Sequence, residues 1–489
     1  MKRTLSRRDF IKLSAVGGGM AIFGFNPQSR SWITQAQAQT QSFSDIPNLD
    51  GVLLFDETTR KALSDDWGHL VHKIPAAVLR PKSVQDIVKI VQYANQHSIK
   101  IAVKGQAHCQ YGQSQAEAGI VIDSGVLNAV QAPTADSVDV QPGVILGQLA
   151  GAALSKSLTP PVLPECMMLT VGGTLSAGGL GNTSQHHGAL VDNVTELDVV
   201  TGDGRFVTCS PDRNAELFNM VLAGMGQCGI IVRARMRLVP LPSHAVLHNL
   251  LYADLEKYIA DQARIAKEGR FDHQYGFASR KADGSWSFTM QVGKFFTPPD
   301  EPNLAELEQD LRFDSKVAPD RMIARDYLYR AAGYLASVRP APTSAAASAP
   351  CASVTMWIPA SATQDFVGRI LALPPKLAGF QRFSFWPLNT RRFTRPLFKV
   401  PGEEQMFSVW LIRRAPPDDR VILSAMHAST RELLANLTAV GGKRYAPWSP
   451  VISREEAQSH YGAEVWRTFS ESKKRFDPNG VLAPQAAKF

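Results

Sequence analysis

The stretch LTVGGTLSAGGLGNTSQHHG, residues 169–188, is the most glycine-rich part of the chain. Its glycines and small hydroxyl residues could offer backbone N–H groups to a diphosphate, as nest-like turns do. It lacks both the GxGxxG spacing of a Rossmann site and the GK[ST] ending of a P-loop. Taken alone, the pattern leaves a phosphate-binding turn and a plain irregular loop both open.

A second glycine turn, KGQAHCQYGQ (104–113), displays His108 between glycines. Glycine has no Cβ and tolerates positive φ, so it lets the backbone approach a ligand closely. The residues before the turn predict a helix from Val84 to Ala94, because Ser83 and Asp86 form a capping signal and apolar residues follow at helical spacing. A strand over 99–103 then leads into the turn.

The surrounding sequence alternates strand and helix patterns. We expect strands over 119–123, 137–144 and 229–241, and a hairpin over 195–209 around Gly202–Gly204. Helices are expected through 149–155 and near 215–222. Since 489 residues exceed one domain of about 100–200 residues, this α+β unit is expected to have a second domain beside it.

Five further stretches complete the pattern: VGGTLSAGG, HGALVDNVTELDVVTGDGRFVTCS, GMGQCGIIVRARM, WPLN (386–389) and FDPNGVLAP (476–484). Together they resemble the PCMH-type FAD-binding domain of the vanillyl-alcohol oxidase superfamily, and within it cytokinin dehydrogenase. The resemblance is dense over 75–242, patchy over 250–440 and returns at the C-terminus. It implies a two-domain α+β flavoprotein, with an FAD-binding domain from 39–245 and 441–489 and a substrate (cap) domain of 246–440 inserted between.

The resemblance also assigns cofactor positions. It implies that His108 bonds covalently to the 8α-methyl carbon of the flavin, a non-covalent contact being the alternative. The other implied cofactor residues are Val103, Gly105, Gln106, Ala107, Cys109, Gln113, Thr170, Gly172, Gly173, Ser176, Leu180, Ile231 and Tyr445. Ala107 and Cys109 stand where the family usually has glycine and serine.

Glu165 is the candidate catalytic residue. It stands five residues before Thr170, where cytokinin dehydrogenases place an aspartate. A carboxylate beside the flavin can take an N–H or O–H proton as hydride leaves the adjacent carbon; a solvated loop glutamate is the alternative. The resemblance further implies substrate contacts by Gln291, aligned with a family glutamate, and by Trp386, which could flank a planar substrate or belong to the core.

Cys166 raises the question of a second covalent link. It lies six residues before Gly172, the spacing of the flavin-bonded cysteine in berberine-bridge-type relatives. The alternative is a small buried hydrophobe.

The first residues predict an export signal. SRRDFIK (6–12) is a twin-arginine pattern, the apolar run after it is shorter than the about 20 residues of a membrane span, and AQA (36–38) supplies a cleavage site. We therefore expect a twin-arginine (Tat) signal peptide over 1–38, recognition by the Tat machinery, and a periplasmic or secreted mature chain without a membrane span. A basic disordered N-terminus or a membrane anchor is the alternative.

Composition excludes other classes. Residues 1–38 hold six basic residues against one acidic residue, so most of the net charge of +8 lies there and no basic stripe for nucleic acid remains. The five cysteines are irregularly spaced, which argues against a disulfide framework. No CxxC or HExxH pattern supports a metal site.

Together these features predict an FAD-dependent dehydrogenase or oxidase. Hydride would pass from an amine or alcohol carbon to covalently bound flavin, as in the oxidative side-chain cleavage of N6-substituted adenines. Oxygen, a quinone or a cytochrome would then take the electrons. The alternatives are a sugar or aromatic-alcohol oxidase on the same scaffold, and a non-catalytic periplasmic binding protein.

Overall fold

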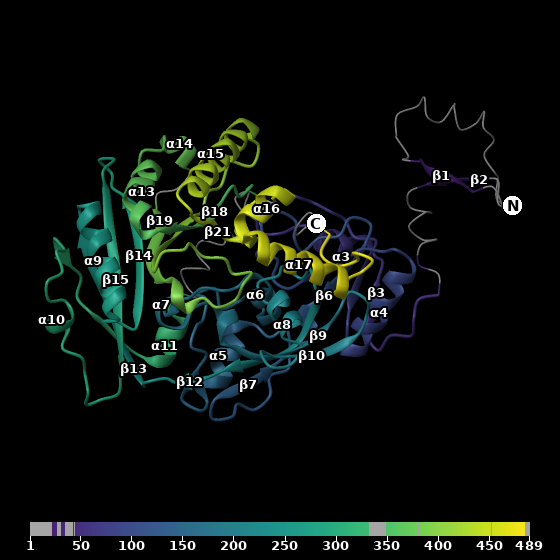
Figure 1. Cartoon of the computed structure of the whole chain (residues 1–489), viewed down its shortest axis with the longest axis horizontal. Coiled ribbons are helices and arrows are strands. Elements are labelled where there is room, and N and C mark those ends of the chain that lie inside the picture. The colour runs from purple at the N-terminus through teal and green to yellow at the C-terminus, as the bar shows by residue number, and fades with distance from the viewer. Residues whose placement is uncertain are drawn as a thin grey trace.

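The computed structural model describes residues 22–26, 31–34, 43, 45–331, 349–378, 382–450 and 452–484. Two four-stranded sheets and a nine-stranded sheet form its main body, which confirms the α+β architecture. The four-stranded sheets lie on the right in Figure 1 and the large sheet on the left. The twin-arginine motif and the cleavage site lie outside the described residues; within 1–38 only β1 (Ile22–Asn26) and β2 (Ser31–Thr34) are described, as an antiparallel pair.

The first sheet carries the turn with His108. Its order is β3 (Val52–Leu54), β4 (Ala77–Arg80), β6 (Ile120–Asp123) and β5 (Ile101–Lys104). β4, β6 and β5 run parallel, and nine of their twelve residues are buried, as expected for a parallel sheet covered on both faces. Helix α4 (Val84–Gln96) connects β4 to β5, so both elements predicted before the glycine turn are confirmed.

The second sheet supports the other glycine-rich stretch. Its order is β10 (Phe206–Cys209), β9 (Val194–Val200), β11 (Ile230–Arg237) and β7 (Ser137–Val140). The predicted hairpin is β9–β10, and the predicted helices are α5 (Leu146–Leu154) and α8 (Ala215–Val221). Residues 169–188 are not a plain loop. They contain the short helices α6 (Val171–Ala177) and α7 (Ser184–His187), separated by Gly178 and Gly179 at φ +127° and +80°, where a side chain would be strained.

The nine-stranded sheet forms a wall with two different faces. Its order is β16 (Ser315–Lys316), β13 (His244–Tyr252), β15 (Trp286–Phe296), β14 (His273–Arg280), β19 (Arg382–Asn389), β20 (Gln405–Leu411), β18 (Val354–Pro359) and β21 (Lys443–Arg444), with β17 (Asp320–Ile323) also paired to β13. Successive side chains alternate between faces. Phe385 and Phe407 pack in a core with residues of α9 (Leu255–Glu268), α13 (Thr363–Leu371) and α15 (Arg420–Ala439). Trp386 and Met406 join the core of the first half of the chain.

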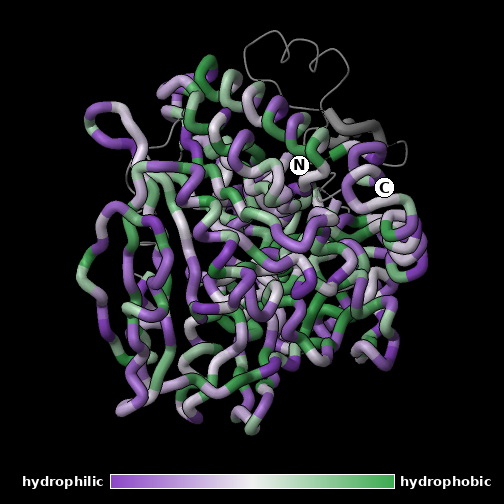
Figure 2. The backbone as a smooth tube through the Cα atoms, turned by 60° about the vertical axis from the view of Figure 1, so that its left-hand side comes forward, coloured by the Kyte–Doolittle hydropathy of each residue, from purple (hydrophilic) through white to green (hydrophobic). Residues whose placement is uncertain are grey.

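The C-terminal segment returns to the first half. Helices α16 (Arg454–Tyr461) and α17 (Ala463–Phe476) lie between the two parts (Figure 1), and Trp466 and Phe469 belong to the same core as Trp386. Leu482 then bridges Ile101, and Gln227 Nε2 donates to the Ala483 carbonyl at 3.0 Å. Hydrophobic stretches gather inside this body, whereas the peripheral loops are mainly hydrophilic (Figure 2).

Asp86 anchors the start of α4 and gives a first prediction. Its buried carboxylate accepts hydrogen bonds from the backbone N–H groups of residues 50, 51, 82 and 83 at 2.7–3.1 Å. Burial alone would raise the pKa of Asp86, but these bonds hold it below its ordinary value. We expect D86N to lower the free energy of unfolding by about 2–4 kcal/mol at pH 7, because the amide cannot accept all four bonds.

The sign of the pH dependence follows from the lowered pKa. The Asp86 carboxylate stabilises the folded state fully above its unfolded-state pKa of about 3.9. This stabilisation is lost as the pH falls through the lower folded-state pKa. The difference in the free energy of unfolding between wild type and D86N, measured by urea unfolding, should therefore become smaller below about pH 4. D56N, at the exposed N-cap of α3 (Glu57–Ala62), is the control, since asparagine caps as well as aspartate. Equal effects of the two substitutions would contradict the role given to Asp86.

Candidate active site

A cavity of about 320 Å³ lies between the two glycine-rich stretches and the inner face of the large sheet. It brings together nearly all of the residues that the sequence singled out. Val103, Gly105, Gln106, Ala107, His108, Cys109, Gln113, Glu165, Cys166, Thr170, Gly172, Gly173, Ser176, Leu180, Ile231, Trp386 and Tyr445 all line it. Gln291 does not. These residues span 343 positions of the chain, so folding has assembled one cavity from distant segments.

Asp66 holds the turn that carries His108. Its buried carboxylate accepts from the backbone N–H groups of Gly68 at 3.0 Å and Gly112 at 2.7 Å, and from Cys109 Sγ at 3.5 Å. Burial raises the pKa of the Asp66 carboxyl, and it raises the pKa of the Cys109 thiol to about 12. The thiol therefore stays protonated at neutral pH and acts as a donor, as a serine hydroxyl would. Ala107 sits at φ +50°, a conformation that glycine adopts more easily.

The imidazole of His108 lies between two indole rings. Its centre is 4.9 Å from that of Trp67 and 5.2 Å from that of Trp448, with interplanar angles of 25° and 31°. The Trp448 indole N–H also donates to the His108 carbonyl at 3.2 Å, and the Trp67 backbone N–H donates to the Ala107 carbonyl at 2.8 Å. Both the ring and the backbone of this position are thus fixed before any ligand arrives.

The backbone of this turn fits a phosphate-bearing cofactor. The N–H groups of Gly105, Gln106, Ala107 and Cys109 donate no hydrogen bond to any residue that the structure describes, although all four residues line the cavity. Unpaired backbone donors at a protein surface are satisfied by water or a ligand, and several in one turn favour an anion. Close to them, a Cβ at Gly105 would lie 2.2 Å from Thr170 Oγ1, so a larger residue at this position would require Thr170 to move.

The opposite wall fits a flat aromatic system. It carries Tyr275, Trp386, Trp410 and Tyr445, and Trp448 connects it to the turn that carries His108. The ring centres of Tyr275 and Trp386 lie 4.9 Å apart, and those of Trp386 and Trp410 lie 6.2 Å apart. The indole N–H of Trp386 is buried and has no hydrogen-bond partner among the described residues. A diphosphate-compatible turn and an aromatic wall in one cavity are what FAD requires.

Glu165 contributes a carboxylate to this cavity. It is partly shielded, with 27% of its side chain exposed. Asn182 Nδ2 donates to its Oε1 at 2.6 Å, and Arg330 Nη2 lies 3.2 Å from the same atom. It is therefore held by the protein and is not a free loop glutamate.

Gln291 lies beside the cavity and not on its lining. Its Oε1 is 3.1 Å from His273 Nε2, and its Nε2 donates to Asn249 Oδ1 at 3.0 Å. The register of β15 places it opposite Tyr275 on β14, which does line the cavity. Gln291 is therefore not among the residues that line the cavity, and its amide is hydrogen-bonded to His273 and Asn249. Its contact with the substrate stays a prediction.

Several residues of the site carry no signal in the sequence. Trp67, Trp410 and Trp448 belong to none of the motifs, and Arg330 lies within 250–440, where the resemblance is patchy. Asn182 could have been found, since it belongs to the same glycine-rich stretch that supplied the cofactor positions. Cys166 lines the cavity, and a second covalent bond between its sulfur and the flavin stays a prediction.

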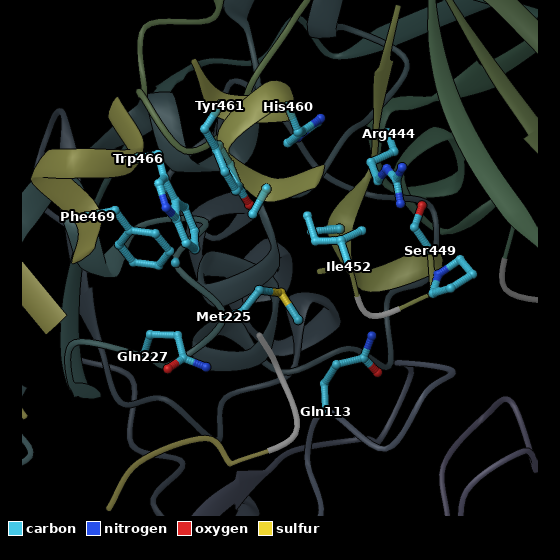
Figure 3. A pocket seen from close by; sticks show the side chains of 14 residues that line it. Gln113, Met225, Gln227, Arg444, Ser449, Ile452, His460, Tyr461, Trp466 and Phe469 are labelled. Carbon is cyan, nitrogen blue, oxygen red and sulfur yellow. The ribbon is translucent and has the colours of Figure 1, made fainter. Parts of the chain in front are cut away.

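A second, much smaller cavity lies next to the first, between α16, α17 and residues 224–227 (Figure 3). Gln113 and Met225 line both cavities. Its volume of about 30 Å³ has room for water but not for a substrate. Burial lowers the pKa of His460 on its wall to about 3, so this imidazole is neutral at pH 7. The small cavity therefore offers no second reaction site.

The residues that the structure describes contain no group of three or more histidine, cysteine or acidic side chains placed to hold a metal ion. No helix in this part of the chain has the length and apolarity to cross a membrane.

Comparisons with known proteins agree with this site. A family model described as an FAD binding domain matches residues 75–210, which include both glycine-rich stretches. A second model, described as cytokinin dehydrogenase 1, FAD and cytokinin binding, matches residues 326–489, which include Trp386 and Tyr445.

Full-length relatives extend the match over most of the chain. An uncharacterized oxidoreductase of the fasciation locus of Rhodococcoides fascians is 32% identical over 438 residues, covering 89% of this chain and 98% of that protein. Cytokinin dehydrogenase 9 of Oryza sativa subsp. japonica is 30% identical over 487 residues, covering 90% and 92%. Cytokinin dehydrogenase 1 of Arabidopsis thaliana is 28% identical, covering 89% and 82%. The chain therefore belongs to the cytokinin dehydrogenase family of FAD-dependent oxidoreductases, with a PCMH-type FAD-binding domain.

Proposed function

We propose that the enzyme oxidises the carbon next to the N6 nitrogen of an N6-substituted adenine, with Glu165 as the base. The observation that carries this proposal is the position of Glu165: a held carboxylate on the wall of the cavity that also contains His108 and the aromatic residues. FAD, when bound, supplies the hydride acceptor.

Residues of the chain bind the cofactor, orient the substrate and accept the proton. The glycine turn at 105–109 offers donors to the diphosphate, and His108 holds the flavin ring through a covalent bond to its 8α-methyl carbon. Trp386 and Tyr275 flank the planar substrate. The Glu165 carboxylate takes the proton from the substrate nitrogen as hydride leaves the adjacent carbon, so that the substrate becomes an imine. Water then hydrolyses the imine to adenine and an aldehyde.

Aromatic residues favour this substrate class over the alternatives. Tyr275, Trp386 and Trp410 present flat apolar surfaces, which suit a purine. A sugar or aromatic-alcohol oxidase on the same scaffold stays the second candidate, favoured if Cys166 also bonds to the flavin. A non-catalytic binding protein would have no use for the held carboxylate of Glu165.

The substrate is tested by mixing the oxidised enzyme with isopentenyladenine in the absence of oxygen. We expect the visible flavin band to bleach, because hydride passes to the flavin and nothing reoxidises it. Adenosine, which has an unsubstituted amino group and no side-chain carbon to oxidise, is the control and should leave the band unchanged. A band that survives isopentenyladenine but bleaches with alcohols or sugars would reject the cytokinin substrate and retain the flavoenzyme.

Two further proposals follow from the sequence. We propose that the Tat machinery exports the chain to the periplasm, by the signal over 1–38. We also propose that oxygen, a quinone or a cytochrome reoxidises the flavin there.

A further inference from the structure

Arg330 brings a positive charge from the inserted part of the chain to Glu165. It follows α11 (Ala324–Tyr329), and its Nη2 atom lies 3.2 Å from Glu165 Oε1. Only 18% of the Arg330 side chain and 27% of the Glu165 side chain are exposed. Partial burial weakens the screening of such a pair by solvent and salt, so it interacts more strongly than a surface ion pair.

Both donors to Glu165 reach the same carboxylate oxygen. Asn182 Nδ2 donates to Oε1 at 2.6 Å, and Arg330 Nη2 donates to Oε1 at 3.2 Å. No residue in the described part of the chain donates a hydrogen bond to Oε2 of Glu165. Since Glu165 lines the cavity, Oε2 is the oxygen left for a substrate proton.

Arg330 is itself held on three sides. Its Nη1 donates to the Tyr327 carbonyl at 2.7 Å, and its guanidinium carbon lies 4.2 Å from the centre of the Tyr327 ring. Its Nη2 lies 3.4 Å from His273 Nδ1. An arginine fixed in this way loses little conformational freedom when it binds a carboxylate.

The neighbours of His273 determine its tautomer. Arg330 Nη2, 3.4 Å from Nδ1, can only donate, so Nδ1 is the acceptor and also accepts from the Tyr327 hydroxyl at 3.0 Å. Nε2 therefore carries the proton and donates to Gln291 Oε1 at 3.1 Å. Burial and the Arg330 charge keep the pKa of His273 well below its ordinary value, so the ring is neutral. Arg330 then carries the positive charge of this cluster.

We propose that Arg330 is a positioning residue for the base Glu165. Together with Asn182 it fixes Oε1 and leaves Oε2 to accept the proton. The proposal rests on the proposed function of Glu165 given above. It also restricts the substrate, which must present an N–H or O–H group to Oε2 next to the carbon that is oxidised.

A double-mutant cycle tests the proposal, with R330M, E165Q and the combined variant. The first readout needs no substrate: the fall in Tm caused by R330M should shrink at least twofold in the E165Q background, because the unpaired carboxylate is then gone. The second readout is anaerobic flavin reduction by isopentenyladenine. R330M should slow it about 10–100-fold in the wild type and leave the E165Q rate almost unchanged. R330K should recover part of the rate, and R325M, an exposed arginine of α11, should behave like the wild type.

Each outcome decides a different point. Additive effects on Tm would show that the two side chains do not interact and would overturn the proposal. Coupled Tm values with additive effects on the rate would mean that the pair is only structural, which also overturns it. If E165Q reduces the flavin at the wild-type rate, the base assignment fails, whatever the Tm cycle shows. If no compound reduces the flavin, the proposed function fails and the Tm cycle alone decides whether Arg330 holds Glu165.

Discussion

Replacing Glu165 with glutamine should slow anaerobic flavin reduction by isopentenyladenine about 10²–10⁴-fold, the usual contribution of a positioned general base. Glutamine has nearly the same shape, and its carbonyl oxygen can still accept from Asn182 and Arg330. Its amide would then stand where Oε2 stands now, and an amide cannot take a proton. Stopped-flow measurements should therefore show a large loss of rate at saturating substrate with little change in the concentration needed for saturation.

Two further variants serve as controls for E165Q. E165D keeps a carboxylate, one methylene shorter, and is the residue that cytokinin dehydrogenases place here, so it should retain more of the rate than E165Q. E117Q removes an exposed glutamate that pairs with Lys73 at 3.1 Å and should not change the rate. An E165Q rate within threefold of the wild type would mean that another group, or water, takes the proton.

The fold could be predicted where local chemistry determines it. The signal Ser83–Asp86 became the capping box of α4, and the apolar run after it became the buried face of that helix. The glycines around 202–204 became the turn between β9 and β10. The two short helices inside 169–188 were not expected, because glycine has a low helix propensity and the turns depend on contacts with distant residues.

The residues of the site could be predicted where they lie in continuous motifs of the sequence, and not where only tertiary folding brings them together. The glycine turn, Glu165 and Thr170 lie in continuous motifs, and the structure assembles them around one cavity. Gln291 shows the limit, because it lies on the same sheet face as Tyr275 and yet is not among the residues that line the cavity. Arg330 could not be found at all, because it lies 165 positions from Glu165 and only tertiary folding joins them.

His108 combines a local and a tertiary requirement. Its place between glycines is visible in the sequence, but the two indoles that fix its ring come from Trp67 and Trp448, which are far apart in the chain. A ring held in one plane loses little entropy when it forms a bond, which favours attachment at a defined position. Cys109, although adjacent, is kept as a thiol by burial, which raises its pKa to about 12 and removes it as a competing nucleophile.

Replacing His108 with alanine should change the fate of the flavin when the protein is denatured. In the wild type, acid precipitation should leave the flavin with the protein, because a covalent bond survives loss of the fold. In H108A, nearly all of the flavin should appear in the supernatant, where its fluorescence measures it. The native variant should still bind FAD, since the backbone donors at 105–109 and the aromatic wall are unchanged.

C166A separates the remaining possibilities. If His108 makes the only link, C166A should retain the flavin through denaturation as the wild type does. If H108A also retains it and only the combined variant releases it, Cys166 forms a second bond and the sugar or alcohol oxidase alternative gains support. If the wild type itself releases the flavin, His108 makes only a non-covalent contact. Trp67 and Trp448 then hold the His108 ring for that contact and not for bond formation.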